Sequence, residues 1–370
     1  MHSPADDADL IHFAMRALRL MHLPDGAFCF ERRVGESNPR GRSLRYTLMV
    51  ELGLLRAQAN VYTLPFVVDE LESVVWREIE RTQLQPGDLG LMLWADARRA
   101  GGRAVELTEH LEASLKAASG LPALLGMELG WIVIGLAHQV ATDGGEGTQR
   151  LLARALDQLV VENRAPSHLF RHFGAQGWRR RFPNFATQIY SVLALSVVAR
   201  HGLDDRALPA AQATADRLLE LQLPDGGWPW LFDAERGTVV ERYEVYSVHQ
   251  DAMAPMALLE LSEACGDERY VRAVERGLSW IHGRNELRAD MVDRRHQLVL
   301  RSIRRRRGLD RFWLAARTGA SLAGLPTPSG AGRLTELNPT DRPYHFGWVL
   351  EAWCGREDAL RAAMSAEPIR

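Results

Sequence analysis

The chain has 370 residues, of which 46% are hydrophobic and 25% are charged, so it can bury a large core and does not have the composition of a disordered protein. Its 45 basic and 47 acidic residues leave a formal net charge of -2, which excludes a global field that draws the protein to nucleic acid or to an anionic membrane. The three cysteines are odd in number and far apart, which excludes a disulfide framework.

Residues 1–9 are acidic, and the apolar core of a secretory signal does not follow them. No stretch has the length and hydropathy of a membrane span. We therefore expect a cytoplasmic protein without a membrane span. The basic runs at 178–181 and 301–307 lack the interleaved aromatic residues of nucleic-acid-binding grooves, so no nucleic-acid partner is expected.

Apolar residues recur at helical spacing from the start of the chain, as in Leu10, Phe13 and Ala17, which predicts an all-α protein. The predicted helices are of two kinds. Amphipathic helices with a charged face cover residues 7–22, 63–83, 103–119, 147–163, 206–222 and 266–283. Helices that are small and apolar, with few polar or aromatic residues, cover residues 43–57, 88–98, 122–140, 184–200, 247–264 and 344–354.

The two kinds alternate along the chain, six of each. Such alternation is expected if each outer helix forms a hairpin with an inner one and the hairpins close on themselves. We therefore predict a single (α/α)6 toroid domain over residues 1–370, with a polar pocket at its centre. Between the last hairpins, residues 287–304 break the rhythm and have the pattern of a short β-hairpin, an insertion that would roof the pocket.

Two turns share one pattern, Leu23-Pro-Asp-Gly-Ala-Phe28 and Leu223-Pro-Asp-Gly-Gly-Trp228. With Gln222, the second resembles the Gln…Gly-Trp repeat of the squalene cyclase and protein prenyltransferase superfamily, and Asp-Gly-Gly-Trp turns also occur in toroidal glycoside hydrolases, polysaccharide lyases and uronate epimerases. This resemblance implies the toroid fold more than any one activity. The Asp-x-Asp-Asp motif of class II terpene cyclases is absent from the inner helices, and no segment beside His249 or His345 matches the prenyltransferase zinc ligands. No metal site or cofactor is predicted, although Asp251, Glu244 and His249 leave a metal site open.

The densest group of polar residues lies at 241–251, just before a small, apolar helical segment. If that helix begins near Ser247 as its N-cap, Tyr246, His249 and Gln250 lie on the face that enters the ring, with Asp251 one position round. Tyrosine and histidine are the acid and base that can remove the proton α to a uronate carboxylate. The alternative is that Asp251 pairs locally and the tyrosines pack.

Hydrolysis of a glycosidic bond instead needs two carboxyl groups that flank it. Asp251 is the first candidate, with Glu244, Glu241 or Glu128 as its partner. Glu128 lies in an apolar helical segment, where a carboxylate is costly to bury unless it is paired or protonated. The alternative for Glu128 is an internal ion pair with an arginine of a neighbouring helix.

The remaining candidates would bind the substrate. Arg45, Arg301 and Arg304 are expected to neutralise an anionic group, although Arg45 is equally compatible with a salt-bridged rim position and Asn184 with a helix N-cap. The other predicted contacts are polar or aromatic residues close to inner-helix starts, namely Tyr46, Gln188, Tyr243, Gln250, Tyr344, His345 and Trp228.

Together these patterns predict an enzyme that acts on an acidic, uronate-type glycan, a small molecule or an oligosaccharide, by lyase, epimerase or hydrolase chemistry. Its catalytic residues are predicted among Tyr246, His249, Asp251, Glu244 and Glu128. Two other functions stay open: an isoprenoid enzyme of the terpene cyclase or prenyltransferase type, and a toroid that binds a glycan or a protein without catalysis. The sequence leaves the oligomeric state open.

Overall fold

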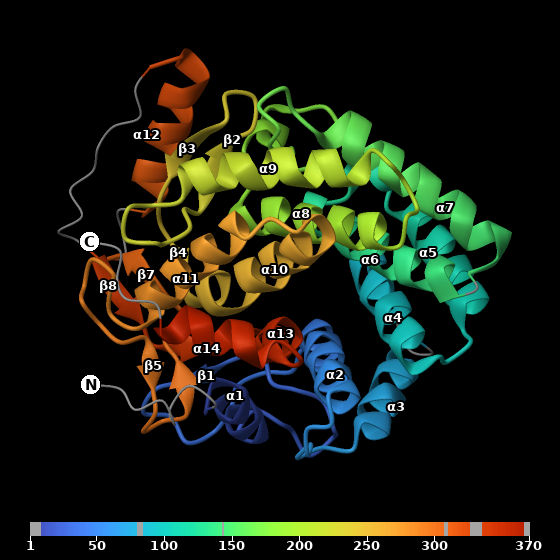
Figure 1. The fold of residues 1–370 in the computed structure, drawn as a ribbon, viewed down its shortest axis with the longest axis horizontal. Helices are drawn as coiled ribbons and strands as arrows, with labels where there is room; N and C mark the ends of the chain where they lie inside the picture. Colours follow the sequence, from blue (N-terminus) through green and yellow to red (C-terminus); the bar gives the residue numbers. More distant parts are fainter. Residues whose placement is uncertain (1–8, 80–83, 143, 307–309, 326–334, 366–370) are drawn as a thin grey trace.

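The computed structural model describes residues 9–79, 84–142, 144–306, 310–325 and 335–365, and these residues are mostly helical (Figure 1). Six helices form an inner ring: α2 (Leu44–Ala59), α4 (Pro86–Arg99), α6 (Gly126–Thr142), α8 (Phe185–Arg200), α10 (Ala254–Cys265) and α13 (Pro343–Trp353). Six helices lie outside it: α1 (Asp9–Arg19), α3 (Val68–Ile79), α5 (Ala104–Ala117), α7 (Gly145–Asp157), α9 (Ala207–Leu221) and α11 (Arg269–Ile281). Two more, α12 (Asp310–Ala323) and α14 (Glu357–Ser365), follow α11 and α13 in the chain.

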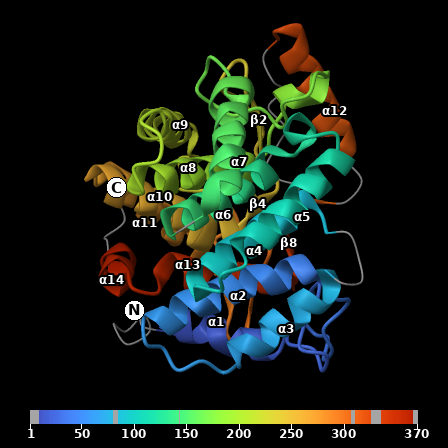
Figure 2. The same cartoon turned by 90° about the vertical axis from the view of Figure 1, so that its right-hand side faces the viewer.

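The inner helices form a closed ring. In chain order each one contacts the next, and α13 packs back on α2. Each outer helix lies against an inner one: α3 on α2, α5 on α4, α7 on α6, α9 on α8, α11 on α10 and α1 on α13 (Figures 1 and 2). The protein is therefore an (α/α)6 toroid, and the predicted fold class is confirmed. The predicted helix ends at 7–8 and 80–83 lie outside the described residues.

Close contacts between inner helices depend on glycines that face each other. A Cβ atom on Gly53 of α2 would lie 2.1 Å from the carbonyl oxygen of Gly347 in α13. A Cβ on Gly135 of α6 would lie 2.2 Å from the carbonyl oxygen of Gly90 in α4. The backbones of these helix pairs thus touch where a larger residue would force them apart.

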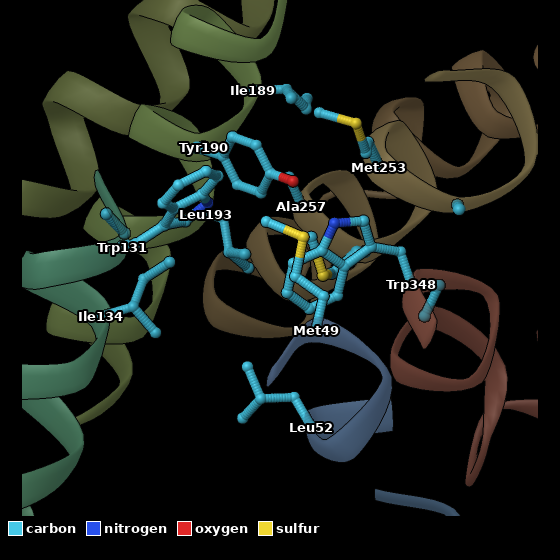
Figure 3. Close-up of a cluster of buried hydrophobic side chains, with 14 of the residues drawn as sticks. Met49, Leu52, Trp131, Ile134, Ile189, Tyr190, Leu193, Met253, Ala257 and Trp348 are labelled. Atoms are coloured by element: carbon cyan, nitrogen blue, oxygen red, sulfur yellow. The ribbon is translucent and has the colours of Figure 1, made fainter. Parts of the chain in front are cut away.

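Large apolar side chains fill the axis of the ring (Figure 3). Met49, Trp131, Tyr190 and Trp348 come from four different inner helices and point toward one another there. The indole rings of Trp348 and Trp94 stack with 5.8 Å between their centroids. The axis is therefore a packed core below the start of the inner helices, and any open space must lie above it.

The two similar turns have the same local structure. The Oδ1 atom of Asp25 accepts the backbone N–H two residues later at 3.1 Å, and Asp225 does the same at 3.1 Å. Gly26 and Gly226 both adopt left-handed backbone conformations, with φ of 87° and 90°. Each aspartate also pairs with the arginine 17 residues further on. The sequence repeat is therefore a structural repeat as well.

Short strands gather near the starts of α10 and α13. They are β1 (Arg32–Arg33), β2 (Leu231–Asp233), β3 (Thr238–Glu241), β4 (Val245–Tyr246), β5 (Val292–Asp293), β6 (Leu298–Val299), β7 (Ser302–Arg305), β8 (Thr335–Asn338) and β9 (Thr340–Asp341). Antiparallel pairs join β1 to β9, β2 to β3 and β5 to β6, and β7 lies between β4 and β8.

The β-hairpin predicted at 287–304 is present in its first part, because β5 and β6 pair with Val292 opposite Val299. In the rest of the predicted range, the chain leaves the hairpin after Val299 and β7 joins a separate sheet. Helices α12 and α14 and the β2–β3 hairpin are among the elements that were not predicted. In the described part of the chain, no helix is long and apolar enough to cross a membrane.

Candidate active site

A cavity of about 250 Å³ lies above the apolar axis, where the inner helices begin. Its lining comes from α2, α6, α8, β4, the helical turn before α10, α13 and the residues before β2 and β7: Arg45, Tyr46, Met49, Met127, Trp131, Asn184, Ala186, Tyr190, Trp230, Tyr246, His249, Met253, Arg301 and Tyr344. Met49, Trp131, Tyr190 and Met253 also belong to the apolar cluster of the axis, so they form the floor (Figure 3). The cavity has a polar upper part and an aromatic, apolar base.

His249 begins a π-helical turn, η5 (His249–Met253), which leads into α10. Its imidazole lies parallel to the indole of Trp230, with 6.2 Å between the centroids, and 5.1 Å from the ring of Tyr246. Burial, with the charges of Arg301 and His345, lowers the pKa of His249 to about 3. His249 is therefore neutral near pH 7, and within the described residues its Nδ1 atom has no hydrogen-bond partner. Negative charge on a bound ligand would raise this pKa, and the neutral imidazole could then accept a proton.

Arg301 brings a positive charge to the same wall. Its guanidinium lies 5.1 Å from the centroid of the Tyr246 ring. Burial opposes this charge, but the phenol oxygens of Tyr344, Tyr246 and Tyr46 outweigh it, and the pKa of Arg301 is raised. No carboxylate of the described residues lies within ion-pair distance of this guanidinium. A half-buried cation without a carboxylate partner is suited to an anionic group of a ligand.

Tyr246 joins these two residues, because its ring contacts both the imidazole and the guanidinium. Burial first, and then the charge of Glu244, raise the pKa of Tyr246 to about 12. Its phenol therefore keeps its proton near pH 7 and acts as a hydrogen-bond donor. The cavity thus combines a neutral base, a proton donor and a cation.

Arg45 also lines the cavity, but its charge is satisfied by carboxylates. Its Nε atom lies 2.5 Å from Oδ1 of Asp88, and its Nη2 atom lies 3.1 Å from Oε1 of Glu128. Burial raises the pKa of Glu128, although the charge of Arg45 opposes this shift. The internal ion pair left open for Glu128 is therefore the arrangement found, and Glu128 does not line the cavity.

Asp251 lies behind the cavity wall, in a buried charge cluster. The Nε2 atom of His345 lies 2.7 Å from Oδ1 of Asp251, and its Nδ1 atom lies 3.3 Å from Oδ1 of Asp341. Burial opposes protonation of His345, but Asp251 and Asp341 outweigh it and raise its pKa to about 10. Asp251 thus pairs with a residue 94 positions away in the chain, and neither it nor His345 lines the cavity, contrary to what was predicted for both.

Other predicted site residues have structural partners. Glu244 accepts a hydrogen bond from Oγ of Ser302 at 2.6 Å. The amide of Gln188 accepts the N–H of Phe170 at 2.8 Å and donates to its carbonyl at 2.7 Å. Gln250 donates from Nε2 to the carbonyl oxygen of residue 246 at 3.0 Å. None of these three side chains lines the cavity. Each one instead forms hydrogen bonds with neighbouring segments of the chain.

The packing contradicts the roles that were predicted for four more residues. Arg304 pairs with Glu336, with 3.0 Å between Nε and Oε1, on the sheet formed by β7 and β8. Tyr243 packs between arginines 242 and 305, outside the cavity. Trp228 is buried behind the cavity wall, where it stacks on Phe185. Ser247 begins the helical segment as expected but is not its N-cap, since its Oγ donates to the carbonyl of residue 300.

Seven of the predicted site residues do line the cavity: Arg45, Tyr46, Asn184, Tyr246, His249, Arg301 and Tyr344. Asn184 is in addition the N-cap of α8, accepting the N–H of Thr187 at 3.0 Å. The aromatic lining residues Trp131, Tyr190 and Trp230 and the carboxylate partner Asp88 were not predicted. The sequence signal for Asp88 was its place at the start of an inner helix, as for Arg45.

The described residues contain no group of three or more His, Cys, Asp and Glu side chains that could hold a metal ion. The cavity adjoins a wider apolar groove of about 760 Å³, and Asn184 and Trp230 line both spaces. The groove runs between the 3-10 turn η4 (Trp178–Arg181) and helix α12.

The closed double ring places the protein in the class of (α/α)6 toroids. No protein-family model and no curated protein sequence matches the chain. Solved structures with the same fold include a sugar epimerase from a ruminal bacterium, with a TM-score of 0.64, 11% identity, and coverage of 95% of this chain and 98% of that one. Cellobiose 2-epimerase from Bacillus thermoamylovorans B4167 is similar at a TM-score of 0.64 and 10% identity, covering 95% and 99% of the two chains.

A glycosyl hydrolase of family 88 from Bacteroides vulgatus has a TM-score of 0.61 and 12% identity, with 97% of this chain and 100% of that one covered. At these identities the similarity establishes the fold, over almost the whole of each chain. The fold alone does not specify the activity, which depends on the residues of the cavity.

Proposed function

We propose that this protein is a carbohydrate-active enzyme that moves a proton at the carbon next to a carbonyl or carboxylate group of an acidic saccharide. The observation that carries the proposal is the neutral imidazole of His249 on the same cavity wall as the guanidinium of Arg301. A base near an unpaired cation can remove a proton whose loss leaves negative charge on oxygen.

The residues have distinct roles in this reaction. The Arg301 guanidinium binds the carboxylate or carbonyl oxygen of the sugar, and His249 accepts the proton of the adjacent carbon. The C–H electron pair moves onto that oxygen, giving an enediolate that Arg301 and the Tyr246 hydroxyl stabilise. Donation of the Tyr246 proton to the opposite face of the carbon gives an epimer, and the tyrosinate then takes up the proton held by His249. Loss of the β-oxygen, with a proton donated by Tyr246, gives an unsaturated lyase product.

Two further observations support this proposal over the other functions. The cavity is lined by two arginines, an asparagine and a histidine beside its aromatic residues, a set that suits hydroxyl and carboxylate groups. Two structures with the same fold are named as a sugar epimerase and a cellobiose 2-epimerase. An isoprenoid enzyme is less well supported, because its hydrocarbon substrate would leave these polar groups unpaired.

Hydrolysis is a second candidate, and one observation favours it. Asp88 and Glu128 lie near the starts of the adjacent inner helices α4 and α6, and Arg45 bridges them. Two carboxyl groups are what glycoside hydrolysis requires. One structure of the same fold, at a TM-score of 0.59 and 14% identity, is named as an unsaturated glucuronyl hydrolase specific for heparin. However, no carboxylate is among the described residues that line the cavity, so hydrolysis would require Arg45 to release one of its partners.

The proposal is tested by hydrogen exchange in D2O. Uronate-containing and neutral saccharides are incubated with the protein, and loss of the C–H signal is followed by NMR, with the product mass measured in parallel. We expect exchange with at least one acidic saccharide, and its loss in His249→Asn. His110→Asn removes an exposed histidine of α5 and should leave exchange unchanged.

The products distinguish the candidates. An epimer has unchanged mass apart from deuterium, a lyase product absorbs near the unsaturated-uronate band, and a hydrolase product has gained water without C–H exchange. Exchange that persists in His249→Asn would contradict the proposal. A hydrolysis product that disappears in Asp88→Asn and Glu128→Gln would replace it with the second candidate.

A further inference from the structure

The groove beside the central cavity has one apolar wall, which is formed by α12. The residues of α12 that line it are Leu314, Ala315, Thr318, Gly319 and Leu322, which form one face of the helix. The opposite wall is formed by residues of η4 and the segment after it, namely Trp178, Arg179 and Phe182. Leu231 of β2 also lines the groove.

Polar contacts on another face of α12 hold this helix in place. The Arg317 guanidinium lies 3.1 Å from Oε1 of Glu241, and both side chains are buried. Ser321 donates from Oγ to Asp233 at 2.5 Å, and Arg181 pairs with the same carboxylate at 2.6 Å. These contacts fix the orientation of α12 and leave its apolar face toward the groove. Buried polar contacts therefore hold in place the helix that forms one wall of the groove.

The rim of the groove is exposed and apolar. Trp178 and Leu322, which line it, are 63% and 45% exposed, and Phe312 of the same helix is 69% exposed. Helix α12 lies at the edge of the ring in both views (Figures 1 and 2). An apolar surface that leads into a pocket is a feature of binding sites, because its exposure to water costs free energy in the free protein.

The groove adjoins the candidate active site, and two residues line both. Trp230 lines both spaces, and on the cavity side its ring lies 5.1 Å from that of Tyr246. Asn184 also lines both, and its side-chain oxygen is used by Thr187, while its amide nitrogen donates to no group of the described residues. A ligand that extends from the cavity into the groove would pass a free hydrogen-bond donor and an aromatic ring at the junction.

We propose that the groove binds an apolar aglycone or acyl chain of the substrate, whose saccharide occupies the central cavity. This inference rests on the proposed function, and it narrows the substrate class to amphiphilic saccharides with an acidic sugar head. The two shared lining residues favour this occupant over a second copy of the chain, because one extended small molecule could contact Asn184 and Trp230 from both the cavity and the groove.

The inference is tested with a series of n-alkyl β-D-glucuronides, from methyl to octyl, by isothermal titration calorimetry with the full chain. A chain that enters the groove should strengthen binding about two- to fourfold for each methylene that leaves water. The gain should level off when the groove is filled. The same series of alkyl β-D-glucosides reports whether the acidic head is also required.

A matched pair of double variants locates the binding. Leu314→Gln with Leu322→Gln makes the groove wall polar, and these residues are 39% and 45% exposed. Leu287→Gln with Leu20→Gln changes leucines that are 37% and 44% exposed elsewhere on the surface. We expect the groove variant to lose most of the chain-length gain with the affinity for methyl glucuronide unchanged, and the control variant to keep the gain.

Three results would overturn the inference: octyl glucuronide binding no more tightly than methyl glucuronide, an equal loss for both ligands in the groove variant, or the same loss in the control variant. Light scattering that shows dimers of the wild type and monomers of the groove variant would assign the groove to a second copy instead. If octyl glucuronide binds in the groove but no saccharide exchanges hydrogen, the proposed reaction fails while the groove assignment stands.

Discussion

The imidazole of His345 bridges two buried carboxylates, with its Nε2 atom 2.7 Å from Asp251 and its Nδ1 atom 3.3 Å from Asp341. This geometry requires both ring nitrogens to carry protons, so the ring is cationic. The cluster joins the start of α10 to α13 and β9, and it supports His249, which lies two residues before Asp251. This pairing explains why His345 and Asp251, which have the chemistry of a catalytic acid–base pair, form part of the scaffold instead.

Replacing His345 with glutamine should lower the free energy of unfolding by about 3–5 kcal/mol, because it leaves two buried carboxylates without a cation. Urea denaturation followed by circular dichroism measures the change. His201→Gln, at an exposed position, serves as the control and should cost much less. An unchanged free energy of unfolding in His345→Gln would show that the cluster contributes no stability.

The same cluster predicts a pH dependence of stability. The pKa of His345 is raised from 6.5 to about 10 in the folded protein, so its stabilising contribution is fully present below pH 6.5 and is lost as the pH rises through 10. We expect the free energy of unfolding to fall across this window, and to fall less in His345→Gln. Urea titrations at intervals between pH 6 and pH 10 test this. Equal slopes in the two proteins would contradict it.

His249 should behave in the opposite way. Its pKa is lowered from 6.5 to about 3, chiefly by burial, so the ring stays neutral as the pH falls from 7 to 5. Nitrogen-15 NMR of the imidazoles should show a neutral His249 and a cationic His345 throughout this range. The proposed activity should accordingly show no loss from protonation of His249 above about pH 5. A His249 signal that titrates near pH 6.5 would contradict the arrangement described for the cavity.

Arg301→Gln should reduce kcat/KM for an acidic saccharide by roughly 10- to 100-fold, the loss expected for a hydrogen-bonded charge pair. A neutral analogue should be affected much less, because it has no carboxylate to place against the guanidinium. Arg304→Gln is the matched control, since Arg304 is three residues away but pairs with Glu336 at 3.0 Å. Equal losses for the acidic and neutral substrates would contradict the role given to Arg301.

Gly53→Ala should destabilise the protein by about 1–3 kcal/mol, because its Cβ would lie 2.1 Å from the Gly347 carbonyl and push α2 away from α13. Thermal unfolding measures this. Gly147→Ala is the control: Gly147 lies in α7 with open space at its Cβ position, so the same change there should stabilise by up to about 1 kcal/mol. Equal effects at the two positions would show that the contact between α2 and α13 can relax.

The twelve helices of the ring could be predicted from the sequence because their signal is local. Charged faces on outer helices and small, apolar inner ones such as α8 follow from a helical period and from which side meets water. The β2–β3 hairpin and α12 were missed because their strands and faces are short and are stabilised by distant partners. Arg317 of α12, for example, is held by Glu241 of β3, 76 residues away in the chain.

By itself, the sequence determined the class of fold and the region of the site, because alternation of helix types and the position of polar residues near helix starts are properties of neighbouring residues. The tertiary structure decided which of those residues line the cavity. Asp251 and His249 are two residues apart, yet one faces His345 inside the scaffold and the other faces the cavity. The same applies to Arg45, whose charge is taken by two carboxylates, and to Arg301, which has none among the described residues. Whether a charge is paired or free depends on residues far away in the chain, and only the folded ring brings them together.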